Sequence, residues 1–278
     1  MTNVHHFQSE GLELVAHLEI PENTEELLPS VLLVHGFPEG PGGGANSAST
    51  LPELANRISS EVGFVTMAPL LRGTGESGGC FSLAGWLTDV RQAILELDKH
   101  PRVEQIWLVG FGSGGAISIC AAALEAKVKG VGALAAPADW SAWAASPKRL
   151  LIHARRAGVI PDPDFPEDFD SWSKELKQIS AEASISDLSE KNVLIVHGTE
   201  DDVVSSLEAR ALSDAHGNTD MRLIEGAGHH LRHDPRAIAV LLGWLDRQRR
   251  SSNCLLYTSD AADEGLGVDL GGRRIIKK

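Results

Sequence analysis

Short, continuous runs of apolar residues recur along the chain, and several of them end in glycine or beside it. Runs of this length, rich in valine, leucine and isoleucine, are typical of strands buried on both faces of a sheet. An earlier stretch, residues 12–20, alternates apolar and polar positions, which predicts a strand at the start of the same sheet. The predicted buried strands are 31–37, 64–70, 105–111, 128–137, 192–198 and 221–230.

Between these runs, apolar residues recur at helical spacing. Segment 51–61 is predicted to be a helix, and segment 234–248 begins with Asp234 as an N-cap and Pro235 at the first helical position. A further helix, within 86–100, has a predicted buried face of Trp86, Val90, Ile94 and Leu97. Buried strands that alternate with amphipathic helices predict the α/β class, with a mostly parallel central sheet flanked by helices.

One interval, residues 139–188, contains no strand pattern and is rich in charge and tryptophan, with prolines in its middle. Loops at the carboxyl ends of the strands surround the ligand crevice of an open α/β sheet. We therefore expect 139–188 to be a small helical cap or lid. The predicted core then has two parts, 1–138 and 189–250.

The last stretch, 253–278, lacks a sustained helical or alternating period and contains the only tyrosine, Tyr257. It resembles the conceptual translation of sequencing-adapter DNA. We expect a non-native, adapter-derived tail and leave it out of the functional argument. The alternative, a genuine disordered tail, leaves that argument unchanged.

Composition narrows the class of partner. The 278 residues carry a net charge of −13, which disfavours binding to nucleic acid or to an anionic membrane. No apolar run approaches the roughly 20 residues of a membrane span, and the N-terminus lacks the pattern of a signal peptide. Three cysteines are too few for a disulfide framework or a zinc site. We expect a soluble cytoplasmic protein that acts on or binds a small molecule, and the oligomeric state is left open.

Five glycine-containing motifs follow predicted strands. VGFGSGG (109–115) lies between strand 105–111 and an alanine-rich helical stretch. In their order along the chain, this motif and the other four resemble the landmarks of the α/β-hydrolase superfamily, and the resemblance covers residues 10–250. It implies the α/β-hydrolase fold and hydrolysis of small ester or amide substrates. The other motifs are HGFPEG (35–40), LLRGTGESGG (70–79), HGTEDDVV (197–204) and GAGHH (226–230).

The resemblance also implies roles for individual residues. VGFGSGG matches the nucleophile elbow, Asp201 matches the acid and His229 the base. A hydroxyl is a poor nucleophile until an imidazole accepts its proton, and a carboxylate orients that imidazole. The backbone amides of Phe37 and Ser113 match the two donors of an oxyanion hole, which stabilise developing negative charge.

The serine of VGFGSGG stands one place later than the superfamily pattern has it. In the pattern small–x–Ser–x–small, Gly110 and Gly114 take the small positions and Gly112 falls at the nucleophile position. A frame with Ser113 as the nucleophile would put bulky Phe111 at the first small position. Glycine also tolerates the positive φ that such a turn requires. We favour Gly112 at the nucleophile position and keep Ser113 as a candidate catalytic residue.

Three mechanisms remain open. Ser113 acts as the nucleophile in a remodelled turn, aided by the helix N-terminus that follows it. Alternatively, Asp201 and His229 activate a water molecule in the space of the missing serine side chain. In the third, the protein is a catalytically inactive pseudoenzyme that binds a small ligand or a protein partner.

Other polar residues have simpler interpretations. His229 and His233 are four residues apart, but they and His230 are predicted to lie in the loop before the next helix, so they lack the helical geometry of a metal pair. The glycine-rich segment 40–49 lacks the Gly-Lys-Ser/Thr ending of a phosphate loop. We therefore expect no metal and no cofactor.

Two polar residues are interpreted as structural, His35 as ordering the loop after it and Arg72 as supporting its own turn. The tryptophans of the interval either line an apolar pocket or pack its helices together; they are Trp140, Trp143 and Trp172.

Overall fold

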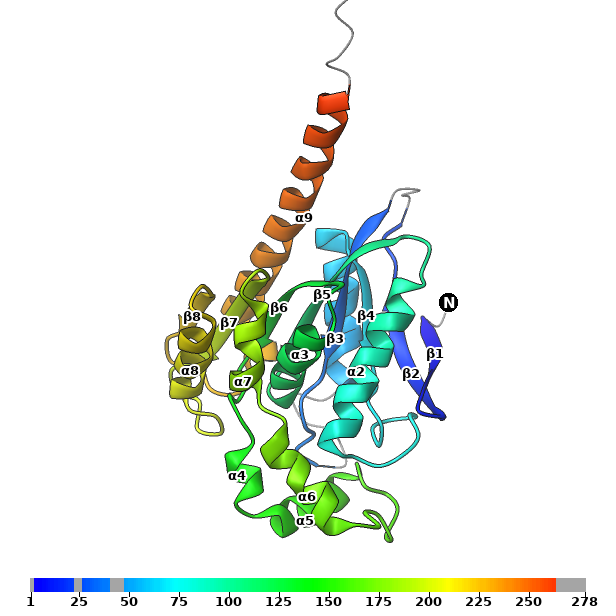
Figure 1. The fold of residues 1–278 in the computed structure, drawn as a ribbon, viewed down its shortest axis with the longest axis vertical. Helices are drawn as coiled ribbons and strands as arrows, with labels where there is room; N and C mark the ends of the chain where they lie inside the picture. The colour runs from blue at the N-terminus through cyan, green and yellow to red at the C-terminus, as the bar shows by residue number, and fades with distance from the viewer. Residues whose placement is uncertain (1–2, 23–26, 41–47, 264–278) are drawn as a thin grey trace, which may run out of the picture.

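The computed structural model describes residues 3–22, 27–40 and 48–263, with side chains described as far as Ser251. Within these residues one sheet of eight strands runs through the molecule in the order β1-β2-β4-β3-β5-β6-β7-β8 (Figure 1). β2 pairs antiparallel with β1 and with β4, and all other neighbours are parallel. The strands are β1 Val4–Ser9, β2 Leu12–Glu19, β3 Leu28–Val34, β4 Val65–Pro69, β5 Val103–Phe111, β6 Val128–Leu134, β7 Asn192–Gly198 and β8 Asp220–Ile224.

Helices cover both faces of the sheet. Apolar side chains of α2, α3, α7 and α8 pack on one face, and those of α1 and α9 pack on the other. The bounds are α1 Leu51–Arg57, α2 Leu83–Asp98, α3 Ser113–Leu124, α4 Ser141–Ala144, α5 Pro147–Ala157, α6 Phe169–Gln178, α7 Ala181–Ile185, α8 Ser206–His216 and α9 Pro235–Asp263. Short 3-10 turns form at Ala48–Thr50, Ser186–Leu188 and Leu231–His233, and a π-helical turn at Ile58–Val62 follows α1. The predicted α/β class, with a mostly parallel sheet flanked by helices, is confirmed.

The seven predicted strands are present, with shifted ends. β6 ends at Leu134 and β8 at Ile224, earlier than predicted, because the chain leaves the sheet there to form the loops at the carboxyl ends of the strands. Two elements were missed by the sequence patterns. One is β1, a polar edge strand, and the other is α8, whose short buried stripe consists of Ala209, Leu212 and His216.

The interval 139–188 is helical, as expected, and contains α4, α5, α6 and α7. Figure 1 shows α4, α5 and α6 together at the carboxyl ends of the parallel strands, at the lower end of the view. The segment is tied to the core by Trp172, which is buried and donates a hydrogen bond from its indole Nε1 to the carbonyl oxygen of Phe81 (3.2 Å). α4, α5 and α6 thus stand over the end of the sheet where the motif loops emerge, whereas α7 packs with α3 and α8 on one face of the sheet and is part of the core.

α9 is longer than the sequence pattern predicted. It continues to Asp263 and extends beyond the body of the molecule at the top of Figure 1, whereas the pattern predicted no helix after 253. Neither proline nor glycine occurs between Gly243 and Gly265, so no residue in that stretch interrupts a helix once it has formed. Residues 264–278 of the expected tail lie outside the described part of the chain.

None of the described helices is long and apolar enough to cross a membrane. Among the residues with described side chains, Cys80 and Cys120 are free thiols. Burial raises the pKa of Cys120 to about 11, so this thiol stays protonated near neutral pH and packs as a small apolar group.

Candidate active site

A cavity of about 530 Å³ lies at the carboxyl ends of the parallel strands. The loop after β3 contributes Phe37, the turn after β5 contributes Gly112 and Ser113, and the loop after β8 contributes His229. Residues of α4 and α5 line it from the side of the 139–188 interval. Segments far apart in the sequence therefore meet around one cavity, as expected for an open parallel sheet.

Asp201 and His229 form a hydrogen-bonded pair at this cavity. Nδ1 of His229 lies 2.9 Å from Oδ2 of Asp201. The other carboxylate oxygen accepts the backbone N–H groups of Val203 (2.9 Å) and Val204 (2.8 Å). The side chain of Asp201 is fully buried, and that of His229 is 11% exposed. Asp201 therefore shapes its own turn and also orients the imidazole.

Hydrogen bonding keeps Asp201 ionised. Burial alone would raise the pKa of this carboxyl, but hydrogen bonds from His197, His229 and the Val204 amide outweigh it and hold the pKa well below its usual range. A fixed negative charge beside His229 favours the tautomer with a proton on Nδ1 and stabilises the imidazolium that forms when Nε2 accepts a proton.

His197, at the end of β7, was not singled out by the sequence analysis. Its Nε2 lies 2.9 Å from the carbonyl oxygen of Val204 and 3.2 Å from Oδ2 of Asp201, and its side chain is fully buried. Its place as the first residue of HGTEDDVV was the available signal. A histidine at the end of a buried strand looks like a core residue until its partner is known.

The turn after β5 is tightly packed around Gly112. This residue has φ 54° and ψ −126°, and α3 begins directly after it. A Cβ atom on Gly110 would lie 2.3 Å from the carbonyl oxygen of Gly114, and one on Gly114 would lie 2.2 Å from that of His35. Both distances are far below van der Waals contact, so these two positions accept only glycine without rearrangement.

Ser113 is directed toward the loop after β3. The backbone N–H of Phe37 donates a hydrogen bond to Oγ of Ser113 (2.7 Å), and Ser113 is 7% exposed. Within the described part of the chain, the Ser113 hydroxyl forms no hydrogen bond with His229. The structure thus brings Phe37, Gly112, Ser113 and His229 to one cavity but directs the serine toward Phe37.

The sequence matches a family model described as the alpha/beta hydrolase family over residues 31–241. The chain belongs to the alpha/beta hydrolase family. A search of curated proteins with the same sequence found no match.

Solved structures resemble this alpha/beta hydrolase over most of their length. Est1E from Butyrivibrio proteoclasticus superposes with a TM-score of 0.66 at 22% identity, covering 91% of this chain and 99% of Est1E. Est1E with bound ferulic acid gives a TM-score of 0.65 at 24% identity, covering 89% and 99%. An esterase from Pyrococcus furiosus gives 0.63 at 16% identity, covering 88% and 90%. At these identities the likeness shows the fold alone.

His35 connects two motif loops of this alpha/beta hydrolase. Its Nδ1–H donates to the carbonyl oxygen of Gly36 (2.9 Å), and its Nε2 accepts the backbone N–H of Leu71 (3.1 Å). Complete burial lowers the pKa of His35 to about 4, so the ring is neutral near pH 7 and Nε2 can act as an acceptor. The loop that carries Phe37 is therefore tied to the loop after β4.

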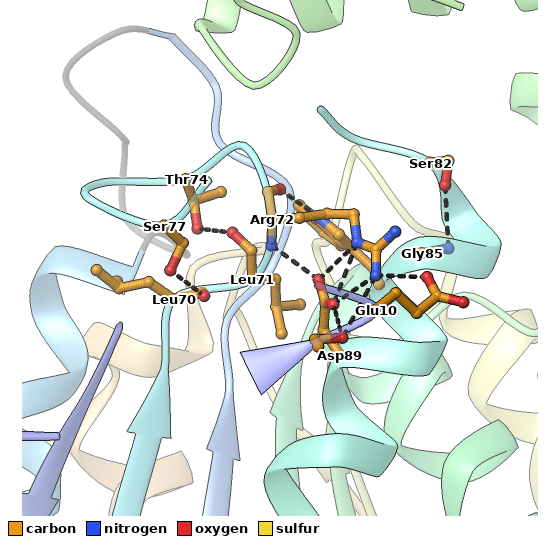
Figure 2. Close-up of polar contacts among 11 residues, drawn as sticks. Glu10, Leu70, Leu71, Arg72, Thr74, Ser77, Ser82, Gly85 and Asp89 are labelled. Atoms are coloured by element: carbon orange, nitrogen blue, oxygen red, sulfur yellow. Dashed lines mark hydrogen bonds and ion pairs between the residues drawn. The ribbon is translucent and has the colours of Figure 1, made fainter. Parts of the chain in front are cut away.

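The loop after β4 is itself anchored by a buried ion pair (Figure 2). The guanidinium of Arg72 contacts the fully buried carboxylate of Asp89 on α2 (2.7 Å), which also accepts the Arg72 backbone N–H (2.8 Å). Ser9 donates its hydroxyl to the same carboxylate (2.6 Å), and Glu10 pairs with Arg72 at 3.0 Å. This network joins the β1–β2 hairpin, the loop and α2.

Aromatic side chains form one wall of the cavity. The ring of Phe37 lies 5.2 Å from that of Trp143 and 5.5 Å from that of His153, between ring centroids. Trp140 also lines the cavity, whereas Trp172 packs away from it against Phe81. Two of the three tryptophans of the interval are therefore cavity residues.

Neighbouring histidines do not form a metal site. His230 lies at the rim of the cavity, 3.5 Å from Glu39, and His233 is exposed in the turn before α9. No group of histidine, cysteine and carboxylate side chains with the geometry of a metal site occurs among the described residues.

Proposed function

We propose that this chain hydrolyses small ester or amide substrates in the cavity, with Asp201 and His229 as the acid–base pair and Gly112 at the nucleophile position. The observation that carries the proposal is the Asp201–His229 hydrogen bond of 2.9 Å, beside the cavity to which Gly112 also contributes. Family membership and esterase-like neighbours at low identity support the same reaction class.

The packing of the turn supports Gly112 as the nucleophile position. The two positions that must be small in a nucleophile elbow flank the nucleophile at −2 and +2. Gly110 and Gly114, whose Cβ atoms would strike backbone oxygens, have this spacing around Gly112. The positive φ of Gly112 is the backbone conformation that such a turn imposes on its central residue, and it is strained only for residues with a side chain.

A water molecule then takes the part of the missing hydroxyl. His229 Nε2 accepts a proton from the water, and the water oxygen attacks the carbonyl carbon of the substrate. As the tetrahedral intermediate collapses, the bond to the leaving alcohol or amine breaks and His229 returns the proton to it. The backbone N–H groups of Phe37 and Ser113 are the candidate donors to the oxyanion.

Ser113 is less suited to be the nucleophile in this geometry, because its hydroxyl accepts the Phe37 N–H and is not hydrogen-bonded to the base. A second candidate function is binding without turnover. It is favoured by one observation, the lack of any side chain at position 112, which removes the covalent route at that position. In both cases the occupant is a small molecule that fits a cavity with an aromatic wall.

The aromatic wall gives a first substrate to try. Phe37, Trp140 and Trp143 line the cavity, and aromatic surfaces favour flat, apolar acyl groups. Est1E, which shares the fold, is known with ferulic acid bound. Aryl and cinnamoyl esters are therefore the substrates to assay first.

The deciding experiment is labelling with a fluorophosphonate, which reacts quickly only with an activated nucleophile. We expect no labelling of the wild type and rapid labelling of Gly112→Ser at the introduced serine. The double variant Gly112→Ser/His229→Ala is the matched control and should not label. Labelling of wild type at Ser113 that disappears in His229→Ala would instead identify a shifted serine nucleophile.

Labelling identifies the reactive residue, and turnover assays distinguish hydrolysis from binding without turnover. Hydrolysis of a cinnamoyl ester by wild type that disappears in His229→Ala would support the water mechanism. Saturable binding of the same ester without hydrolysis, with activity gained in Gly112→Ser, would support the pseudoenzyme. Failure of Gly112→Ser to label would mean that Asp201, His229 and the backbone donors are not arranged for acyl transfer, and it would contradict the proposed hydrolysis.

A further inference from the structure

One donor of the candidate oxyanion hole is already engaged by a side chain. The Phe37 N–H, which a substrate oxygen would need, donates to Oγ of Ser113 at 2.7 Å. An N–H group makes one well-aligned hydrogen bond, so an oxygen of a bound ligand and the Ser113 hydroxyl compete for it. Ser113 and Phe37 both line the cavity, so the competition takes place where the substrate would bind.

We propose that the Ser113 hydroxyl is a built-in occupant of the oxyanion position, which a ligand oxygen must displace to reach the Phe37 amide. Ser113 is then a positioning residue that limits oxyanion stabilisation. This inference rests on the proposed function, because it takes the Phe37 amide as one of the two oxyanion donors.

Local structure keeps the hydroxyl in this place. Ser113 is the first residue of α3 and follows Gly112, whose positive φ sets the direction in which the helix leaves the turn. Phe37 is held from the other side, because the loop that carries it is tied through His35 to Leu71. Both partners thus belong to well-anchored segments, which hold the hydroxyl and the amide in contact.

The cost of displacement sets the expected size of the effect. A ligand oxygen that replaces the Ser113 hydroxyl at the Phe37 amide gains only the difference in free energy between the two hydrogen bonds. It is therefore stabilised less than it would be by an unoccupied amide. An unoccupied oxyanion donor commonly contributes a factor of about 100 or more in rate. A neutral hydroxyl that competes for it should remove roughly a factor of 10 of that gain.

The test compares Gly112→Ser with Gly112→Ser/Ser113→Ala in the rate of fluorophosphonate labelling. Removing the hydroxyl frees the Phe37 amide, so we expect the double variant to label roughly 10-fold faster. The matched control is Gly112→Ser/Ser118→Ala, because Ser118 is a buried serine on the same helix whose hydroxyl, among the described residues, bonds the Gly114 carbonyl oxygen alone (2.7 Å). That control should label at the rate of Gly112→Ser.

A second measurement tests the hydrogen bond directly, without a labelling reaction or catalysis. Selective ¹⁵N labelling of the seven phenylalanines gives a simple amide spectrum, in which Phe37→Leu assigns the Phe37 signal. Loss of the hydrogen bond in Ser113→Ala should move the Phe37 amide proton upfield, and Ser118→Ala should leave it in place.

The outcomes separate this inference from the proposed function. A moved Phe37 signal with faster labelling of the double variant supports both. A moved signal with no labelling of any variant overturns the proposed function and leaves the engagement of Phe37 by Ser113 intact. An unmoved signal, or slower labelling after Ser113→Ala, overturns the inference, because the hydroxyl would then be absent from the amide or would itself be a donor to the oxyanion.

Discussion

His197 and His229 share one oxygen atom of Asp201. Oδ2 of this carboxylate lies 3.2 Å from Nε2 of His197 and 2.9 Å from Nδ1 of His229. His197 comes from the end of a buried strand, so it fixes the carboxylate from inside the core while His229 meets it from the cavity side. The orientation of the candidate base therefore depends on a residue that does not line the cavity.

Replacement of His197 by leucine should raise the pKa of Asp201, because one of the hydrogen bonds that favour the carboxylate is lost. The Val204 carbonyl also loses its partner, so the free energy of unfolding should fall by about 1–3 kcal/mol. The ¹³C chemical shift of the Asp201 carboxyl against pH and a urea unfolding curve measure the two effects. His216→Leu is the control. This buried histidine bonds the Leu188 carbonyl oxygen (2.9 Å), so its loss should lower stability without changing the pKa of Asp201.

Protonation of the buried His35 should make the protein less stable in mild acid. Its pKa is about 4 in the folded protein and 6.5 in the ordinary, unfolded state, so between these values the unfolded chain binds a proton that the folded chain does not. Stability therefore falls as the pH drops below 6.5, by roughly 2 kcal/mol between about pH 7 and pH 5. Urea unfolding at the two pH values should give this difference in wild type and a smaller one in His35→Gln. An equal pH dependence of stability in both proteins would show that His35 does not cause the loss.

Asp89 should be among the most costly polar residues to remove. Asp89→Ala leaves the guanidinium of Arg72, only 11% exposed, without its buried partner, and the unfolding free energy should fall by about 3–5 kcal/mol. Glu10→Gln removes a partner of the same guanidinium whose side chain is 58% exposed, and should cost less than about 1 kcal/mol. Comparable losses for the two variants would argue against the anchoring role of the buried pair.

Two glycines on helices should respond to alanine with opposite signs. Gly114→Ala places a Cβ 2.2 Å from the His35 carbonyl oxygen and should destabilise the fold by about 1–3 kcal/mol. At Gly243 on α9 the nearest atom lies 3.9 Å from the added Cβ, so Gly243→Ala should stabilise by about 0.4–1 kcal/mol through helix propensity. Thermal unfolding of both variants tests the packing of the turn after β5 against that of an open helical site.

The sheet could be predicted because its central strands are buried on both faces and so appear as apolar runs. β1 escaped prediction because an edge strand needs few apolar residues, and His5 and His6 interrupt its pattern. α8 escaped because only one narrow stripe of it is buried among charged residues. Burial on both faces leaves a pattern in the sequence, and partial burial leaves much less.

At the candidate site, the resemblance of the motifs to those of the superfamily predicted the pairing of Asp201 with His229, but contacts between side chains and distant backbone were not predictable. The hydrogen bond between Ser113 and Phe37 joins the first residue of α3 to a loop that is distant in the sequence. The ion pair between Arg72 and Asp89 was not predicted either: Arg72 was expected to have a structural role, but the sequence did not indicate which residue it contacts. Such contacts depend on loop geometry at the scale of an ångström, which hydrophobic periodicity does not encode.

The positive φ of Gly112 has a consequence for the balance between stability and activity. A residue with a side chain held in a strained turn of this kind costs about 1–3 kcal/mol of folding free energy, a large part of the margin of a typical domain. Glycine adopts φ 54° with little strain, so this chain keeps the shape of the turn without that penalty. A serine restored at position 112 should therefore gain reactivity at the expense of thermal stability, and the two properties should change together in any series of variants at this position.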